Sequence, residues 1–92
     1  MATKLPRAKI GDSVLVEWED SYGCSAKWAV LDGCDTPQTM RCRSVGWITN
    51  KCRKYIVVVP HVAENEILDV KQGCGDMAIP IRAIVRMKRV EF

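Results

Sequence analysis

The chain has 92 residues, a length that suits one domain with a modest core and leaves little room for a large active-site cleft. Hydrophobic residues make up 48% and charged residues 27% of the sequence, which is typical of a folded globular protein. The formal net charge of +3 is weaker than the bias expected of a dedicated nucleic-acid binder. We therefore expect one domain over residues 1–92, with residues 1–9 as a frayed basic tail.

The sequence also bears on location and on metal binding. No apolar run approaches the ~20 residues of a membrane-spanning helix, and the start lacks the apolar part of a secretory signal. Five cysteines, at positions 24, 34, 42, 52 and 74, are odd in number and lack the close spacing of a zinc site. These features favour free thiols in a reducing cytoplasm, with no metal, no cofactor and no membrane contact.

The first predicted element is a strand that follows the turn signal Gly11-Asp12. Val14, Val16 and Trp18 alternate with other residues, and this period of two predicts that their side chains face a core. Glu17 and Glu19 should then face water.

A long irregular segment from residue 20 to residue 38 comes next, rich in glycine and aspartate. Loops this long in compact domains are often functional. We expect Trp28 and Leu31 to anchor the segment to the core, and Tyr22 to lie on an exposed turn.

A second strand is predicted over residues 39–49, interrupted by Gly46. A glycine inside a strand indicates a bulge or a tight bend. A bulge at this position would turn Trp47 inward and leave Arg41 and Arg43 outside.

The remaining elements are a strand at 54–60, a polar loop with at most one helical turn at 61–75, a short strand at 76–79, a tight turn at 81–84 and a last strand at 85–90. Within the loop, Gly73-Cys74-Gly75 is predicted to be a turn, and Pro80 ends the short strand because it has no backbone N–H to donate. The predicted fold is mainly β: a small five-stranded SH3-like barrel with long loops and a one-turn 3-10 helix before the last strand. An OB-like barrel is the alternative.

The stretches VLVEWEDS, RCRSVGW, YIVVVPH and GDMAIPIRAIVRM together resemble a group of small proteins encoded by bacteriophages and prophages. The residues that carry the resemblance are Trp18, Asp20, Trp28, Val45, Gly46, Trp47, Ile79, Pro80 and Ile84. The resemblance implies a phage or prophage setting and a small β-barrel, and it supplies no catalytic residues.

Catalytic chemistry has little support in the sequence. A reactive thiolate needs a nearby base, and His61 is the only histidine that could serve Cys74. Glu17 and Glu19 are close enough to form an acid–base pair, but nothing else converges on them. We assign no catalytic residues and expect no enzyme.

Two sets of residues are candidates for binding. The aromatic and acidic residues Tyr22, Trp28, Glu19 and Asp20 suit a protein partner. The basic residues Arg41, Arg43, Arg53, Lys54, Arg86 and Lys88 suit a nucleic acid if they meet on one face, with Trp47 or Tyr55 for base stacking.

We therefore expect a cytoplasmic binding module that engages a protein of the bacterial host, as a monomer or a homodimer. A nucleic-acid-binding barrel that uses its basic sheet face is one alternative. A virion or assembly component is the other.

Overall fold

The structure is a computed structural model that describes residues 8–21, 28 and 38–91. Within these residues it contains seven strands and one 3-10 turn, so the prediction of a mainly β fold is confirmed. The elements are β1 (Ser13–Asp20), β2 (Met40–Lys51), β3 (Tyr55–Val59), β4 (His61–Asn65), β5 (Val70–Cys74), β6 (Met77–Pro80), η1 (Ile81–Ala83) and β7 (Ile84–Arg89). None of the described elements is a helix long and apolar enough to cross a membrane.

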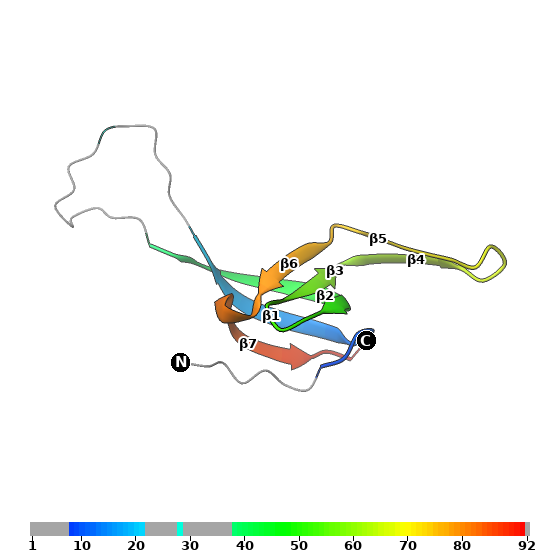
Figure 1. Cartoon of the computed structure of the whole chain (residues 1–92), viewed down its shortest axis with the longest axis horizontal. Coiled ribbons are helices and arrows are strands. Elements are labelled where there is room, and N and C mark those ends of the chain that lie inside the picture. Colours follow the sequence, from blue (N-terminus) through cyan, green and yellow to red (C-terminus); the bar gives the residue numbers. More distant parts are fainter. Residues whose placement is uncertain (1–7, 22–27, 29–37, 92) are drawn as a thin grey trace.

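Five of the strands form one antiparallel sheet in the order β6-β3-β2-β1-β7 (Figure 1). Its edge strands, β6 and β7, are joined only by η1. Four strand spacings would separate the edges of a flat sheet by about 19 Å, whereas the four Cα–Cα steps from Pro80 to Ile84 span at most about 14 Å. The sheet must therefore curl, but no pairing between β6 and β7 closes it among the described strands.

The core fills the concave side of this sheet. Its fully buried side chains include Val14 and Val16, as the alternation in the first strand predicts, and Trp18 packs against them. The core residues are Ala8, Val14, Val16, Ile48, Ile56, Val58, Ile79, Ile84 and Met87. Ala8 belongs to the core and the Lys9 N–H donates to Asp12, so these two residues of the predicted tail are part of the fold; residues 1–7 lie outside the described chain.

The predicted bulge at Gly46 is wrong. β1 and β2 pair without a break from Ser13 opposite Trp47 to Asp20 opposite Met40. The irregularity of β2 lies instead between Ile48 and Asn50, on the side that pairs with β3. Gly46 is required by a close approach, since a Cβ there would lie 2.5 Å from the Val59 carbonyl oxygen.

Without a bulge at Gly46, Trp47 stays on the same face of β2 as Arg41, Arg43 and Val45. Its side chain is half-buried on this outer face rather than turned into the core, contrary to the prediction.

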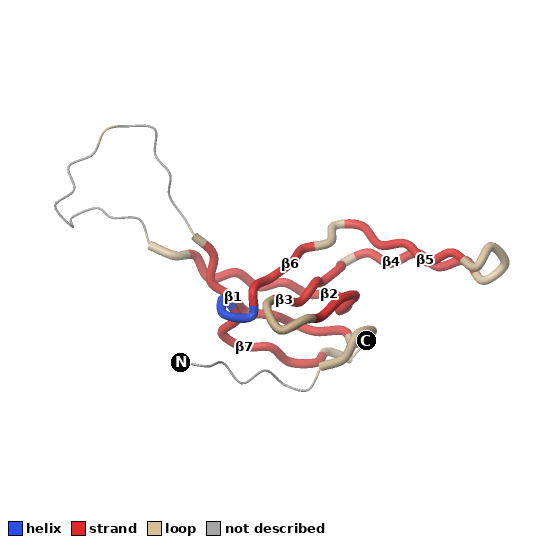
Figure 2. The backbone as a smooth tube through the Cα atoms, in the orientation of Figure 1, coloured by secondary structure: helices blue, strands red, loops and turns tan. Residues whose placement is uncertain are grey.

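The polar segment after β3 is a β-hairpin rather than a loop with a helical turn. β4 and β5 pair from His61 opposite Cys74 to Asn65 opposite Val70 and form a separate two-stranded sheet. Gly73 and Cys74 are thus the end of a strand, and only Gly75, with φ of +79°, makes the turn into β6. Figure 2 shows the hairpin leaving the main sheet, with its turn at the far end.

Candidate functional site

The tip of the hairpin is the most exposed apolar part of the described chain apart from Trp28. Four residues, Glu66 to Asp69, connect β4 to β5. Ile67 is 94% and Leu68 is 69% exposed. Two acidic residues, Glu66 and Asp69, flank this apolar pair.

Asn65 and Asp69, on either side of the tip, are residue types that favour a turn. The Asn65 side-chain oxygen accepts a hydrogen bond of 3.0 Å from the Leu68 N–H. Asp69 adopts a positive φ of 51°, a conformation that aspartate tolerates better than most residues. Ile67 and Leu68 are not types that turns favour, so their presence at the tip is not explained by the local structure.

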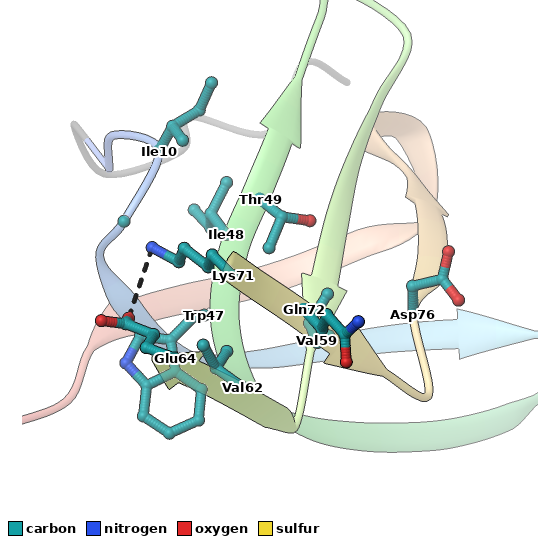
Figure 3. A pocket seen from close by; sticks show the side chains of 12 residues that line it. Ile10, Trp47, Ile48, Thr49, Val59, Val62, Glu64, Lys71, Gln72 and Asp76 are labelled. Carbon is teal, nitrogen blue, oxygen red and sulfur yellow. Dashed lines mark ion pairs between the residues drawn. The ribbon is translucent and has the colours of Figure 1, made fainter. Parts of the chain in front are cut away.

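A groove of about 960 Å³ lies where the hairpin meets the main sheet (Figure 3). Trp47, Val59 and Val62 form apolar parts of its lining. Across the hairpin, the Lys71 ammonium and the Glu64 carboxylate form an ion pair at 3.6 Å. The base of the hairpin forms one wall of the groove and packs against the main sheet beside it, since a Cβ at Gly73 would lie 2.8 Å from Val59 Cγ1.

A cluster of charges occupies the convex face of the sheet. The register places Glu17 of β1 between Arg43 of β2 and Arg86 of β7. The Arg86 Nη2 donates to Glu17 Oε1 at 2.7 Å, and the Arg43 Nε and the Arg41 Nη1 lie 3.7 Å from the Glu17 carboxylate oxygens. Arg41 also donates to Glu19 Oε1 at 3.1 Å. The prediction that Glu17 faces water is therefore wrong, since this residue is only 9% exposed.

These contacts set the protonation of Glu17. The hydrogen bond from Arg86, together with the positive charges of Arg86, Arg43 and Arg41, holds the pKa of Glu17 below its ordinary value of 4.5, although burial acts in the opposite direction. A carboxyl whose pKa is lowered by folding stabilises the fold fully above the unfolded value. That contribution is lost as the pH falls through the lower folded pKa.

We expect the Glu17→Gln variant to show this linkage. At pH 7 the variant should be less stable than the wild type, because an uncharged amide replaces the carboxylate between the guanidinium groups. Below about pH 4.5 the difference should shrink as the wild-type carboxyl becomes protonated. Thermal unfolding from pH 7 to pH 3 measures both chains. A gap between the two melting temperatures that stays constant over this range would contradict the assignment.

The structure brings together part of the predicted basic set. Arg41, Arg43 and Arg86 meet at Glu17, and Lys88 is on the same face because it pairs with Leu15, two residues before Glu17. Arg53 and Lys54 lie apart from the cluster, in the turn between β2 and β3.

The set predicted for a protein partner is only partly described. Tyr22 lies outside the described residues, as does Leu31. Trp28 is fully exposed, so the expectation that it packs on the core is wrong. Glu19 and Asp20 are exposed at the end of β1, where Glu19 is engaged by Arg41.

The thiols and His61 form no assembled site in the described chain. His61 and Cys74 are paired across the hairpin, but no hydrogen bond joins their side chains among the described contacts. The pKa of the Cys52 thiol is lowered, because the backbone N–H groups of Lys54 and Tyr55 favour its thiolate. No group of three metal-ligating side chains gathers in the parts of the chain that the structure describes.

Sequence reasoning missed the hairpin tip. The signal for it was Ile67-Leu68, the one pair of adjacent apolar residues between Glu64 and Gln72, a stretch in which Val70 is the only other apolar residue. Comparison of the chain with protein-family models, with curated proteins and with solved structures gives no match.

Proposed function

We propose that the chain is a non-enzymatic binding module that engages a protein partner through the tip of the β4–β5 hairpin. The observation that carries this proposal is the near-complete exposure of Ile67 and Leu68 on a hairpin that extends away from the main sheet (Figure 1). Burial of one such side chain against a partner contributes about 1.5–3 kcal/mol. The tip therefore holds enough apolar surface to anchor a complex.

The charges of the tip define the surface that it fits. Glu66 and Asp69 adjoin the apolar pair, and the third acid of the hairpin, Glu64, is already paired with Lys71. The complementary surface is an apolar pocket with lysine or arginine at its rim, because charges across an interface are arranged to be complementary. In the phage setting that the resemblance implies, the partner would be a protein of the bacterial host.

The curled main sheet is the base from which this hairpin extends. The strand order and the one-turn connection before the last strand resemble the arrangement of an SH3-like barrel, and we propose this finer fold for the main sheet. The function of the chain does not follow from this fold, since barrels of this kind have many functions. The proposal therefore depends on the hairpin tip.

Replacement of the apolar pair tests the proposal. Affinity capture from host lysate treated with nuclease should retain a protein with the wild-type chain and lose it with the double variant Ile67→Ser and Leu68→Ser. With the partner purified, calorimetry should show at least about a tenfold loss of affinity for the double variant. The fold should be preserved, because neither side chain is buried.

A matched control removes two other exposed apolar side chains, Met77 in β6 and Val85 in β7. The control variant, Met77→Ser with Val85→Ser, should retain the partner. Equal loss from both variants would show that the tip has no special role. In a second capture, from a lysate of phage-infected host cells, retention only of phage structural proteins would instead support a virion or assembly component.

A further inference from the structure

The convex face of the sheet carries a second candidate surface, distinct from the hairpin tip. Four cations lie on it, from Arg41, Arg43, Arg86 and Lys88, against the two carboxylates of Glu17 and Glu19. The face thus keeps a net charge of +2, two thirds of the formal charge of the whole chain.

Glu17 binds the three arginines, but it does not occupy all of their N–H donors. The side chains of Arg41, Arg43 and Arg86 remain 48%, 71% and 66% exposed. A guanidinium has five N–H donors, and each of these arginines spends only one or two of them on carboxylates. Glu17 therefore fixes the positions of the guanidinium groups, while most of their donors have no carboxylate partner among the described residues and can meet an outside anion.

We infer that this face binds the phosphate backbone of a single-stranded nucleic acid. Arginine suits phosphate because its planar fork donates two parallel hydrogen bonds to the oxygens. Along the same face of β2, Trp47 follows Arg43 by four residues; it is half-buried beside the base of the hairpin, so only the exposed part of its ring can contact a base. Cations beside an aromatic ring on an open sheet are the combination that single-strand binding proteins use.

A duplex fits this surface less well. Reading a major groove needs a helix or a two-stranded ribbon that inserts into it. The only projecting ribbon in the described chain is the β4–β5 hairpin, and its tip carries acidic residues that phosphate would repel. A curved sheet face is better suited to an extended single strand laid across it.

Fluorescence anisotropy with a fluorescein-labelled oligothymidylate of about 15 nucleotides tests the inference. Each phosphate contact to a single strand contributes about −0.7 to the slope of log K against log salt. Four contacts predict that affinity falls about 50-fold between about 50 and 200 mM salt. Absence of binding at the lower salt concentration would overturn the inference.

A matched pair of variants locates the surface. The double variant Arg43→Gln with Lys88→Glu should lower the salt slope by about 1.4. The control, Arg53→Gln with Lys54→Glu, makes the same change in net charge in the turn between β2 and β3 and should keep the wild-type slope. An equal effect of the two variants would mean a response to net charge alone, and would overturn the inference.

Two further measurements distinguish loss of the binding surface from unfolding of the variant, and a nucleic acid from an acidic peptide as the ligand. Among the described residues the ion pairs of Glu17 are with Arg41, Arg43 and Arg86 and not with Lys88, so Lys88→Glu alone leaves the arginine cluster intact and should still weaken binding if the double variant unfolds. Polyglutamate added at the same charge concentration should not displace the oligonucleotide. Displacement would assign the face to acidic peptides and overturn the inference.

Discussion

Gly46→Ala should lower the free energy of unfolding by about 3 kcal/mol, at the upper end of the usual cost of overpacking. The added Cβ would lie 2.5 Å from the Val59 carbonyl oxygen and 2.8 Å from the Val59 carbonyl carbon. These are backbone atoms of β3, so relief of the clash would disturb the pairing of Trp47 with Val59. Urea denaturation followed by tryptophan fluorescence measures the loss.

Gly73→Ala is the matched control for this substitution. Its Cβ would also make a short contact, 2.8 Å, but the atom it meets is Cγ1 of the Val59 side chain. Val59 is buried and stiff, but its methyl group can move at lower cost than the backbone of a central strand, so we expect a smaller loss of about 1–2 kcal/mol. Similar losses at the two positions would contradict the backbone explanation for Gly46.

Gly46 also shows why one feature of the sheet could not be predicted. A glycine within a strand signals either a bulge or a close approach of another backbone, and the sequence does not distinguish the two. The distinction depends on how the curled sheet brings Val59 over β2, which is a tertiary contact. The error about Gly46 produced the error about Trp47, since the direction of every later side chain in a strand depends on the register.

The strands of the main sheet were predictable because each buries one face. Val14 and Val16 show the alternation directly, and Pro80 marks the end of β6. The last strand shows a local exception: Ile84 and Met87 both face the core although they are three residues apart. The shift in register between β1 and β7 at this point accommodates them.

The β4–β5 hairpin could not be read from the same pattern. Apart from the half-buried Val62, its strand residues are exposed, so no apolar alternation marks either strand. A two-stranded hairpin with little buried surface is only marginally stable alone. Its stability depends on the contact between Gly73 and Val59 at its base, which links residues from two different sheets.

Part of the charge cluster was predictable from the alternation of side chains along each strand. Strand parity correctly placed Arg41 with Arg43 and Arg86 with Lys88, each pair on the outer face of its own strand. Parity does not say which strands are neighbours. Only the position of β1 between β2 and β7 puts Glu17 at the meeting point of the arginines.

Two isoleucines separate the role of the hairpin tip from the stability of the fold. Ile56 is completely buried in the core, and Ile56→Ala should lower the free energy of unfolding by about 2–5 kcal/mol, because it leaves a cavity. Ile67→Ala removes the same atoms from a side chain that is 94% exposed, and its effect on stability should stay within about 0.5 kcal/mol. Urea denaturation of the two variants measures this contrast.

Binding should show the reverse order at temperatures where both variants are folded. Ile67→Ala should weaken capture of the protein partner, whereas Ile56→Ala should leave it unchanged, because Ile56 contacts only the interior. A tip variant that is as stable as the wild type and binds the partner equally well would refute the role of the tip. A loss of stability in Ile67→Ala would mean that the side chain packs within the fold. The opposite responses of two identical side chains would show that the chain keeps Ile67 at its surface for a partner.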